Sequence, residues 1–306
     1  MRNGPVLVTG ASGFLAAWII PKLLATGRRV IATDIKRDET RLQLVTKTQS
    51  LPDIEWMELD IGDEQACLDI AKQYSPSDIL HLAALMIPAC KASPIKGANI
   101  NLVGHMHMLE AARSVSARLT YTSSIAAKPR GKANAPANLY GVYKRADEEI
   151  SRLYSEDFGV SSLGLRPNIV YGVGRDLGET AVVTAAARAA ALGDAYTLPW
   201  HTRAGFEFVD DIAEMFSRAV MTDWEGAAVS DMGHTMATTE EIAAAILQAA
   251  PKAQISIAPQ DRMSPTEGFD VVPLVSKIGA LPATSIEHGI GATIAHFREL
   301  RELGLM

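Results

Sequence analysis

The chain has 306 residues, of which 48% are hydrophobic, so it can bury a substantial core in one large domain or in one domain with a smaller lobe. Its formal net charge of -6 argues against nucleic acid or an anionic membrane as the main partner, because either would favour a concentrated basic face. The two cysteines, Cys67 and Cys90, lack zinc or redox spacing and are too few for a disulfide framework.

The N-terminal stretch and the hydropathy pattern favour a cytoplasmic protein. The first residues, MRNGPVLVTG, lead almost directly into a strand pattern, without a charged leader, an apolar run and a cleavage site. No apolar run reaches membrane-spanning length. We therefore expect a reducing, cytoplasmic environment.

Short runs rich in valine and isoleucine alternate with longer helical patterns. In chain order these are PVLVTG, FLAAWIIPKLLATG, RVIATD, IEWMELD and DILHLA, then RLTYTSS, a helix that holds Tyr140, and SSLGLRPNIVYG. This alternation is typical of βαβ units in a parallel sheet that is covered on both faces. The sequence therefore predicts an α/β fold with a doubly wound, Rossmann-like parallel sheet.

From about residue 174 the alternation becomes less regular. Helix patterns near 178–192, 210–222 and 238–250 are separated by short strand candidates. We expect residues 1–173 to form a Rossmann-like, cofactor-binding domain and residues 174–306 to form a smaller substrate-binding α/β lobe, with strand exchange between the two.

A glycine turn follows the first predicted strand, in the stretch TGASGFLA. Gly10 and Gly13 stand between this strand and a helix, so backbone N–H groups can approach a pyrophosphate at the helix N-terminus. Asp34 ends the second predicted strand about twenty residues after Gly13, near the separation expected for a carboxylate that binds ribose hydroxyls. The alternative is a tight turn with an ordinary surface aspartate.

Asp34 also bears on the choice of cofactor. Its negative charge repels the 2′-phosphate of NADP, whereas it can hydrogen-bond the hydroxyls of NAD, so NAD is the expected cofactor. Lys36 and Arg37 follow closely and can accommodate a phosphate, but they also suit a solvated helix start.

The helix near residues 138–158 carries Tyr140 and Lys144 on one face, because residues four apart are neighbours on a helix. Many surface helices carry such a pair by chance. A phenol titrates near 10 when unperturbed, so it needs a neighbouring cation to act near neutral pH, and Lys144 supplies one. The pair is therefore a candidate for acid–base chemistry.

Taken together, the motifs resemble the extended short-chain dehydrogenase/reductases, also called the NAD-dependent epimerase/dehydratase family. The stretches that carry the resemblance are TGASGFLA, Asp34, LDI at 59–61, HLAA at 81–84, NINLVG at 99–104, TSS at 122–124, PANLYGVYK at 136–144, LRPNIVYG at 165–172 and FVDDIAEMF at 208–216. They cover nearly the whole chain in the family's order.

The resemblance implies roles for individual residues. Tyr140 becomes the proton donor or acceptor, Lys144 its partner, and Ser124, preferred over Ser123, the group that polarises the reacting oxygen. The implied cofactor-binding residues are Gly10, Gly13, Phe14, Leu15, Asp34, Asp60, Ile61, Leu82, Ala83, Ala84, Asn101, Tyr140, Lys144 and Pro167. The candidate substrate-binding residues are Met86, Ser124, Asn168 and Arg175.

The chain also departs from the family pattern. Ala204 stands where nucleotide-sugar enzymes usually place an arginine that holds the substrate diphosphate, and Arg203 lies one residue early. Ile125 and Ala126 replace the acidic pair of the 4,6-dehydratases, so sugar 4,6-dehydration is not expected.

Two catalytic functions and one other remain open. The first, which we favour, is an NAD-dependent dehydrogenase of a small sugar, polyol or hydroxy acid; the second is a nucleotide-sugar epimerase that holds NAD tightly. The third is a non-catalytic NAD-sensing binder, against which the intact Ser124, Tyr140 and Lys144 speak. The sequence leaves the substrate and the reaction direction undetermined.

Basic residues near the expected pocket suggest a substrate with a carboxylate. Lys128, Arg130 and Lys132 lie between Ser124 and Tyr140, and Arg175 follows a strand. A guanidinium can grip a carboxylate with two parallel hydrogen bonds, although short basic loops are also commonly solvated.

We expect no metal site, because His105 and His107 are only two apart on a predicted helix and face different ways. The resemblance further suggests a homodimer through helices near 94–113 and 138–158, although their apolar faces can equally belong to the core.

Overall fold

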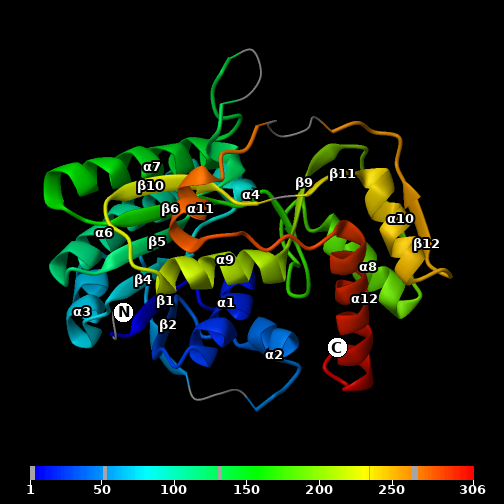
Figure 1. Ribbon diagram of the computed structural model, residues 1–306, viewed down its shortest axis with the longest axis horizontal. Helices are drawn as coiled ribbons and strands as arrows, with labels where there is room; N and C mark the ends of the chain where they lie inside the picture. Colours follow the sequence, from blue (N-terminus) through cyan, green and yellow to red (C-terminus); the bar gives the residue numbers. More distant parts are fainter. Residues whose placement is uncertain (1–3, 51–53, 130–132, 234, 263–267) are drawn as a thin grey trace.

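The computed structural model describes residues 4–50, 54–129, 133–233, 235–262 and 268–306. Within these residues a central sheet of seven parallel strands runs in the order β10-β6-β5-β4-β1-β2-β3, which confirms the expected doubly wound α/β fold (Figure 1). Its strands are β1 (Val6–Thr9), β2 (Val30–Asp34), β3 (Glu55–Glu58), β4 (Asp78–His81), β5 (Arg118–Thr122), β6 (Ser162–Arg166) and β10 (Ala227–Asp231).

The first strand illustrates why the sequence folds in this way. Every residue of β1 is buried, as expected for a strand that is covered on both faces. Because successive side chains point to opposite faces, Val6 and Val8 join one hydrophobic cluster and Leu7 joins another. The strand therefore requires a continuous run of apolar residues and not an alternation of apolar and polar ones.

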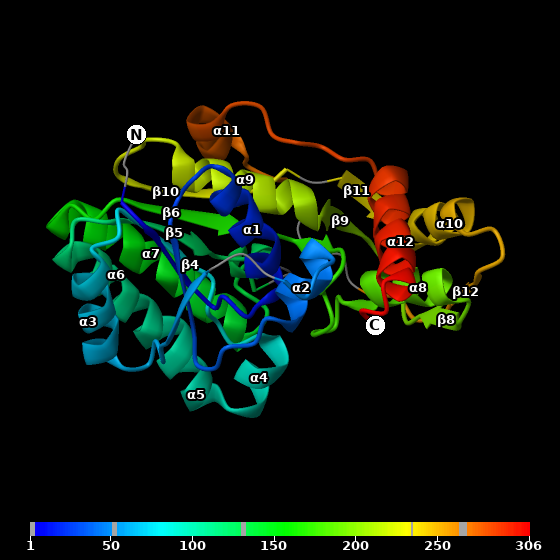
Figure 2. The same ribbon diagram turned by 90° about the horizontal axis from the view of Figure 1, so that it is seen from below.

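Helices cover both faces of the sheet (Figure 2). One layer contains α1 (Phe14–Ala25), α9 (Val209–Met221) and α11 (Val272–Ile278), and α2 (Thr40–Thr46) packs beside α1. The other contains α3 (Glu64–Tyr74), α6 (Gly104–Ser114) and α7 (Leu139–Phe158). Short segments connect the strands to these helices: α4 (Ile87–Ala92), α5 (Pro94–Ala98), the π-helical turn η1 (Asn99–Val103) and the 3₁₀ turn η2 (Ile125–Ala127).

The remaining elements form a lobe with its own hydrophobic core. It contains the strands β11 (Thr235–Thr238), β9 (Arg203–Phe208) and β7 (Ile169–Tyr171) in one sheet and β12 (Gln254–Ile257) and β8 (Ala195–Leu198) in another. Its helices are α8 (Val182–Leu192), α10 (Thr239–Ala249) and α12 (Ile286–Glu302). The helix pattern expected from about residue 178 thus begins at Val182.

The stretch SSLGLRPNIVYG divides into two strands at Pro167. The part before the proline is β6 of the central sheet, and the part after it is β7 of the lobe. Proline has no N–H group to continue a ladder of hydrogen bonds, which suits a point where the chain leaves one sheet for another.

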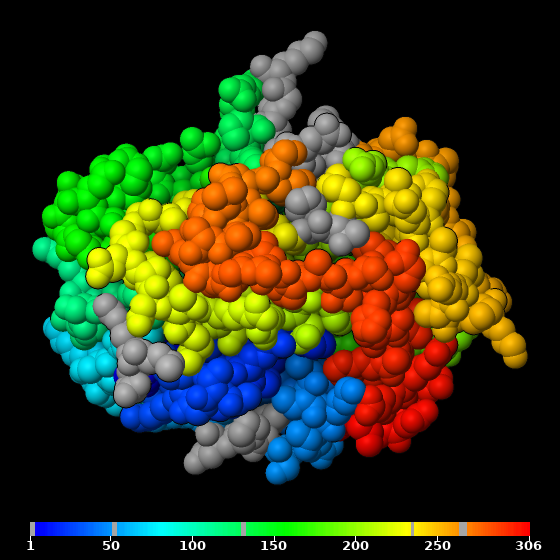
Figure 3. All heavy atoms as spheres, viewed as in Figure 1, coloured from blue at the N-terminus to red at the C-terminus, as the bar shows by residue number. Residues whose placement is uncertain are grey.

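Segments beyond residue 174 return to the central sheet. β10 pairs with β6, and α9 packs along α1. In Figure 3, α11 and the segment after it lie over α9, where Thr284 bonds through its N–H and its hydroxyl to the carboxylate of Asp211. Residues after 174 thus contribute to the domain predicted for residues 1–173. We retain the division near residue 173, with this exchange of segments, as a proposal.

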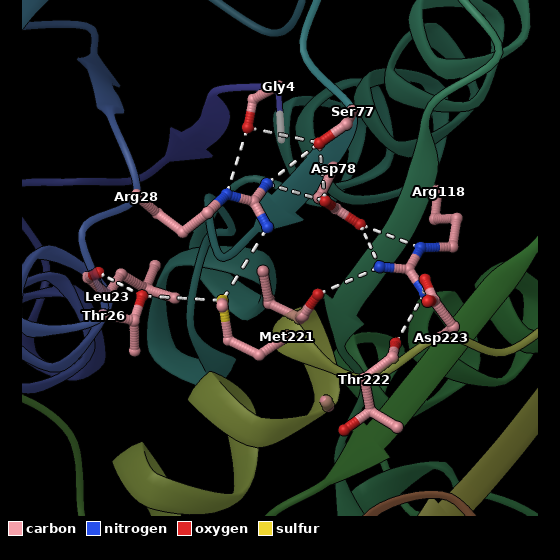
Figure 4. A network of polar contacts seen from close by, with 12 residues as sticks. Gly4, Leu23, Thr26, Arg28, Ser77, Asp78, Arg118, Met221, Thr222 and Asp223 are labelled. Atoms are coloured by element: carbon pink, nitrogen blue, oxygen red, sulfur yellow. Dashed lines mark hydrogen bonds and ion pairs between the residues drawn. The ribbon is translucent and has the colours of Figure 1, made fainter. Parts of the chain in front are cut away.

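A buried ionic network joins several elements at the amino edge of the sheet (Figure 4). Asp78, at the start of β4, pairs with Arg28 at 2.8 Å and with Arg118 at 2.6 Å. Arg118 also donates to the carbonyl oxygens of Val220 and Thr222 at the end of α9. The network thus ties β4, β5 and the C-terminus of α9 together, on the edge opposite to the candidate site.

Candidate functional site

The predicted motifs meet at the carboxyl edge of the central sheet. Thr9 pairs with His81, and His81 pairs with Tyr121, in the parallel registers of β1, β4 and β5. The segments after these strands therefore lie side by side, and ligands of open α/β sheets bind outside this edge. The edge holds Gly10 after β1, Leu82 after β4, Ser124 after β5 and Pro167 after β6.

The glycine turn after β1 is sterically demanding. Gly10 has a φ of 69°, and a Cβ there would lie 2.7 Å from the backbone nitrogen of Ala83. Gly13 donates its N–H to the carbonyl oxygen of Gly10 and begins α1 without a side-chain cap. Because the first amides of a helix need partners from outside it, the N–H groups of Phe14 and Leu15 suit an anion. The turn therefore fits the pyrophosphate of a dinucleotide.

Asp34 lies next to this turn at the end of β2. One carboxylate oxygen accepts from the N–H of Ser12 at 3.0 Å and the other from the N–H of Ile35 at 2.8 Å. A carboxylate has further lone pairs, so ribose hydroxyls can still bind. Arg37, one of the two cations that follow Asp34 closely in the sequence, is paired with Glu39.

The segment after β3 brings Asp60 and Ile61, two of the predicted cofactor-binding residues, to the same place. Leu59 donates its N–H to the carbonyl oxygen of Asp34 at 2.9 Å. Asp60 accepts from the N–H of Gly62, and Ile61 is buried. Asp60 and Ile61 therefore adjoin Asp34.

The segment after β4 is held by buried polar groups. The N–H of Leu82 bonds to the carbonyl oxygen of Thr9, whose hydroxyl lies 2.7 Å from Nδ1 of His81. Burial, together with the charge of Lys144, lowers the pKa of His81 to about 3, so this imidazole is neutral. Ala83 and Ala84 remain partly exposed along the edge, and Met86 is exposed.

Asn101 holds the segment after β4 through two hydrogen bonds. It lies in the π-helical turn η1 and is buried. Its amide oxygen accepts from the N–H of Leu85 at 2.7 Å, and its amide nitrogen donates to the carbonyl oxygen of Leu85 at 2.8 Å. Asn101 therefore fixes the segment that follows Leu82–Ala84.

The two neighbouring serines after β5 differ in environment. Ser123 is fully buried and donates to Glu148 on α7. Ser124 is partly exposed, and its hydroxyl accepts from the N–H of Ala126 at 3.1 Å. Since the hydroxyl of Ser124 retains its proton for donation, it is the better candidate for contact with a substrate oxygen.

Tyr140 and Lys144 lie on the first turns of α7, whose N-terminus is capped by the side chain of Asn138. Both side chains are buried, and Tyr140 packs in a small cluster with Ala126 and Cys90. A Cβ at Gly141 would lie 2.3 Å from the carbonyl oxygen of Ala126, so only glycine lets α7 approach η2 this closely. This approach brings the loop of Ser124 beside Tyr140.

Arg175 lies over the ring of Phe14 and interacts electrostatically with Tyr140. Its guanidinium carbon is 5.7 Å from the centre of the Phe14 ring, and Nη2 donates to Thr180. Burial lowers the pKa of Arg175, while the charges of Tyr140 and Asp176 oppose this shift. Among the described residues, its buried Nε has no hydrogen-bond partner. The guanidinium therefore retains a donor for an anion.

Lys128 of the predicted substrate loop is held by other groups. Lys128 pairs with Asp231 at 2.6 Å and donates to the carbonyl oxygen of Gly268, so it is already engaged. Arg130 and Lys132 lie outside the described residues.

Sequence reasoning missed two buried acids near the site. Asn168 donates its N–H to Glu207 at 2.8 Å, and burial raises the pKa of Glu207 well above its usual range. Asp147 lies beside Lys144 on α7. A charged residue within the otherwise apolar stretch GFEFV was the signal for Glu207, and the helical spacing from Lys144 was the signal for Asp147.

The structure offers no grouped metal ligands within the ranges it describes. His105 bonds through Nε2 to the hydroxyl of Ser151, and His107 bonds through Nδ1 to the carbonyl oxygen of Ile61. In those same ranges, no helix is both long and apolar enough to cross a membrane.

Comparison with known proteins identifies a family whose sequence pattern this chain matches. The sequence model of the NAD dependent epimerase/dehydratase family matches residues 6–233. The chain is 30% identical over 187 residues to UDP-glucuronate 4-epimerase 4 of Arabidopsis thaliana, a match that covers 56% of this chain and 43% of that protein. The chain spans about half the length of the curated relatives it matches.

Solved structures share the fold over nearly the whole chain. The UDP-glucose 4-epimerase of Thermus thermophilus, in complex with NAD, has a TM-score of 0.76 and 24% identity, covering 96% of this chain and 99% of that one. The L-threonine dehydrogenase of Clostridium difficile has a TM-score of 0.82 and 20% identity, covering 100% of both chains.

Proposed function

The chain belongs to the NAD-dependent epimerase/dehydratase family, whose members are enzymes that use NAD, and on this premise we propose that it is a dehydrogenase of a small polar alcohol. The alcohol is a sugar, a polyol or a hydroxy acid, and the net reaction transfers a hydride between it and NAD. When bound, NAD supplies the hydride acceptor or donor at its nicotinamide ring.

In this proposal the protein's own side chains manage the proton. Ser124 donates a hydrogen bond to the reacting oxygen. Tyr140 takes the proton of the alcohol during oxidation and returns it during reduction. Lys144, one helical turn later on the same face of α7, supplies the positive charge of the site. Leu82, Ala83, Ala84, Asn101 and Pro167 border the cofactor beside these groups.

The observation that carries the proposal is the close approach of α7 to η2 at Gly141. It supports a site in which Ser124 and Tyr140 serve one substrate oxygen, although they come from different elements. The same sheet edge carries the glycine turn and Asp34. A structural tyrosine–lysine pair on a surface helix needs none of these neighbours.

Arg175 supports a substrate with a carboxylate. Its guanidinium lies near Tyr140 and has an unpartnered Nε. A carboxylate held there would orient a neighbouring carbinol toward Tyr140. By contrast, Ala204 is fully buried at the position where nucleotide-sugar enzymes usually carry a diphosphate-binding arginine. A small hydroxy acid therefore suits the site better than a nucleotide diphosphate sugar.

A nucleotide-sugar epimerase is the second candidate. The Arabidopsis relative is a UDP-glucuronate 4-epimerase, and glucuronate also offers a carboxylate to Arg175. In that reaction the cofactor would remain bound, and no NADH would be released.

The test is a panel of sugar acids, neutral polyols and UDP-sugars, followed by NADH absorbance and by separate analysis of the epimers formed. We expect NADH formation with a small hydroxy acid, and its near loss in Tyr140→Phe with NAD binding retained. Interconversion of UDP-sugars without net NADH would favour the epimerase. NAD binding without turnover of any compound would favour the NAD-sensing binder.

A further inference from the structure

Asp147 is a buried acid that the proposed chemistry does not use. Its exposed fraction is 0% and that of Lys144 is 2%. Oδ2 of Asp147 lies 3.3 Å from Nζ of Lys144, one helical turn earlier on α7. Neither carboxylate oxygen has a well-aligned hydrogen-bond partner among the described residues. Burying a carboxylate in this way is costly unless its charge is compensated.

The surroundings leave Lys144 as the compensating group. Glu148, also on α7, is paired with Arg166 of β6. His105 of α6 is a buried imidazole whose pKa is lowered well below its usual value by burial, so it carries no positive charge near neutral pH.

Two further titratable groups face the pair from the sheet. His81 of β4 is neutral for the same reason as His105. Tyr121 of β5 stays protonated, because burial raises its pKa beyond the ordinary range. Within the part of the chain that the structure describes, the polar layer between the sheet, α6 and α7 thus contains one ammonium, that of Lys144. It faces one otherwise uncompensated carboxylate, that of Asp147.

The carboxyl group of Asp147 ionises near neutral pH. Burial raises the pKa of Asp147 to about 7, and the charge of Lys144 opposes the rise. The carboxylate is therefore ionised at moderately alkaline pH. A buried ammonium without a counter-ion loses its proton more readily, because desolvation disfavours its charged form.

We propose that Asp147 is a positioning residue of the site, whose carboxylate is the buried counter-ion that keeps the Lys144 ammonium charged and held on the face of α7 that carries Tyr140. The ion pair of Asp147 and Lys144 belongs to the folded chain and requires no cofactor or substrate. Its effect on turnover rests on the proposed function. Removing the charge of Asp147 makes Lys144 lose its proton at a lower pH.

The first experiment is a double-mutant cycle without cofactor or substrate, measured by thermal unfolding at about pH 8.5. In the wild-type background, Asp147→Asn should lower Tm by about 3 °C or more, because Lys144 loses its counter-ion. In a Lys144→Met background the same change should raise Tm, because it removes a lone buried carboxylate. Asp157→Asn, an exposed acid on the same helix, is the matched control and should change little.

The second experiment follows NAD affinity by calorimetry and kcat/KM across pH. In Asp147→Asn the alkaline limb of both profiles should move to lower pH by about one unit or more, while Asp157→Asn leaves them in place. If Asp147→Asn does not fold, Asp147→Ser enters the same measurements.

The outcomes separate this inference from the proposed function. The counter-ion role would be overturned if Asp147→Asn changed Tm equally in the wild-type and Lys144→Met backgrounds. It would also be overturned if the alkaline limb of the NAD-affinity profile stayed at the same pH. A sign reversal in the cycle together with the shifted NAD-binding limb supports that role, even if no substrate turns over; such a lack of turnover contradicts only the proposed function.

Discussion

Asp34 sits beside the phosphate turn with both carboxylate oxygens oriented by backbone N–H groups. We expect NAD to bind at least about tenfold more tightly than NADP, since one charged hydrogen bond contributes about 1.5 to 3 kcal/mol. Dissociation constants of NAD and NADP, measured by calorimetry, check this. Asp34→Ser should reduce the difference in affinity between the two cofactors. Equal or tighter binding of NADP would show that Lys36 and Arg37 outweigh the carboxylate.

Glu207 predicts a pH dependence of stability. Burial raises its pKa in the folded state, so the fold retains a proton that the unfolded chain releases. The unfolded state binds fewer protons above the ordinary pKa of a glutamic acid, and this contribution to stability therefore falls as pH rises from there toward the folded-state value. Glu207→Gln retains an acceptor for the N–H of Asn168 but removes the ionisation.

The measurement is thermal unfolding of wild type and Glu207→Gln at about pH 5 and about pH 8. We expect the difference in Tm to shift in favour of the variant at the higher pH, while the exposed control Glu302→Gln follows wild type. A difference that stays constant with pH would mean that Glu207 takes up no proton on folding.

At the scale of single elements, the contact of α7 with η2 depends on a glycine, Gly141, which has no Cβ atom. The space at Gly141 cannot hold a Cβ without displacing the backbone of Ala126. Gly141→Ala should therefore lower Tm and reduce turnover more than it reduces NAD affinity, because the Ser124 loop moves away from Tyr140 while the glycine turn is untouched.

The matched control is Gly291→Ala in α12, where a Cβ meets no atom within 4 Å. This change should leave activity intact and be neutral or stabilising by about 0.5 to 1 kcal/mol, because alanine favours a helix over glycine. Full turnover in Gly141→Ala would show that the close approach is not needed for the chemistry.

At the scale of the whole molecule, the Asp78 network joins the amino edge of the sheet to the end of α9 (Figure 4). Asp78→Asn should lower the free energy of unfolding by about 3 to 5 kcal/mol, because the buried guanidinium groups of Arg28 and Arg118 lose the carboxylate that they share, while Arg118 keeps the exposed and more distant Asp223 at 3.6 Å. Denaturant unfolding measures this loss. Glu55→Gln, which breaks an exposed ion pair with Arg29, should cause no comparable change, and equal effects would argue against the network's role.

The outer surface of α5 and α7 supports the expected homodimer, which we retain as a proposal. Ile95, Val142, Leu153 and Phe158 are all exposed there. Burial of these side chains against a second copy would remove apolar surface from water. Sedimentation should show a dimer that Leu153→Lys converts to monomer, whereas Leu247→Lys on α10 should not. A monomeric wild type would contradict the proposal.

Much of the fold and the outline of the site were predictable from the sequence because they depend on local patterns. Alternating strand and helix periods predicted the sheet, and the glycine turn, Asp34 and the spacing of Tyr140 and Lys144 are each contained within one or two neighbouring elements. Strand order at a parallel edge then follows from general rules of α/β folds. The local chemistry of these stretches therefore determined where the candidate site lies.

Other features were decided only by tertiary packing. Lys128 was a candidate for substrate, but the fold brings Asp231 to it from 103 residues away. β10 returns from the lobe to the central sheet, and Glu207 reaches Asn168 from β9. The sequence places Asp147 one turn after Lys144, but only burial between the sheet, α6 and α7 makes it a counter-ion. Charge, burial and close approach depend on which distant segments exclude water from a group, and residue spacing along the chain does not carry that information.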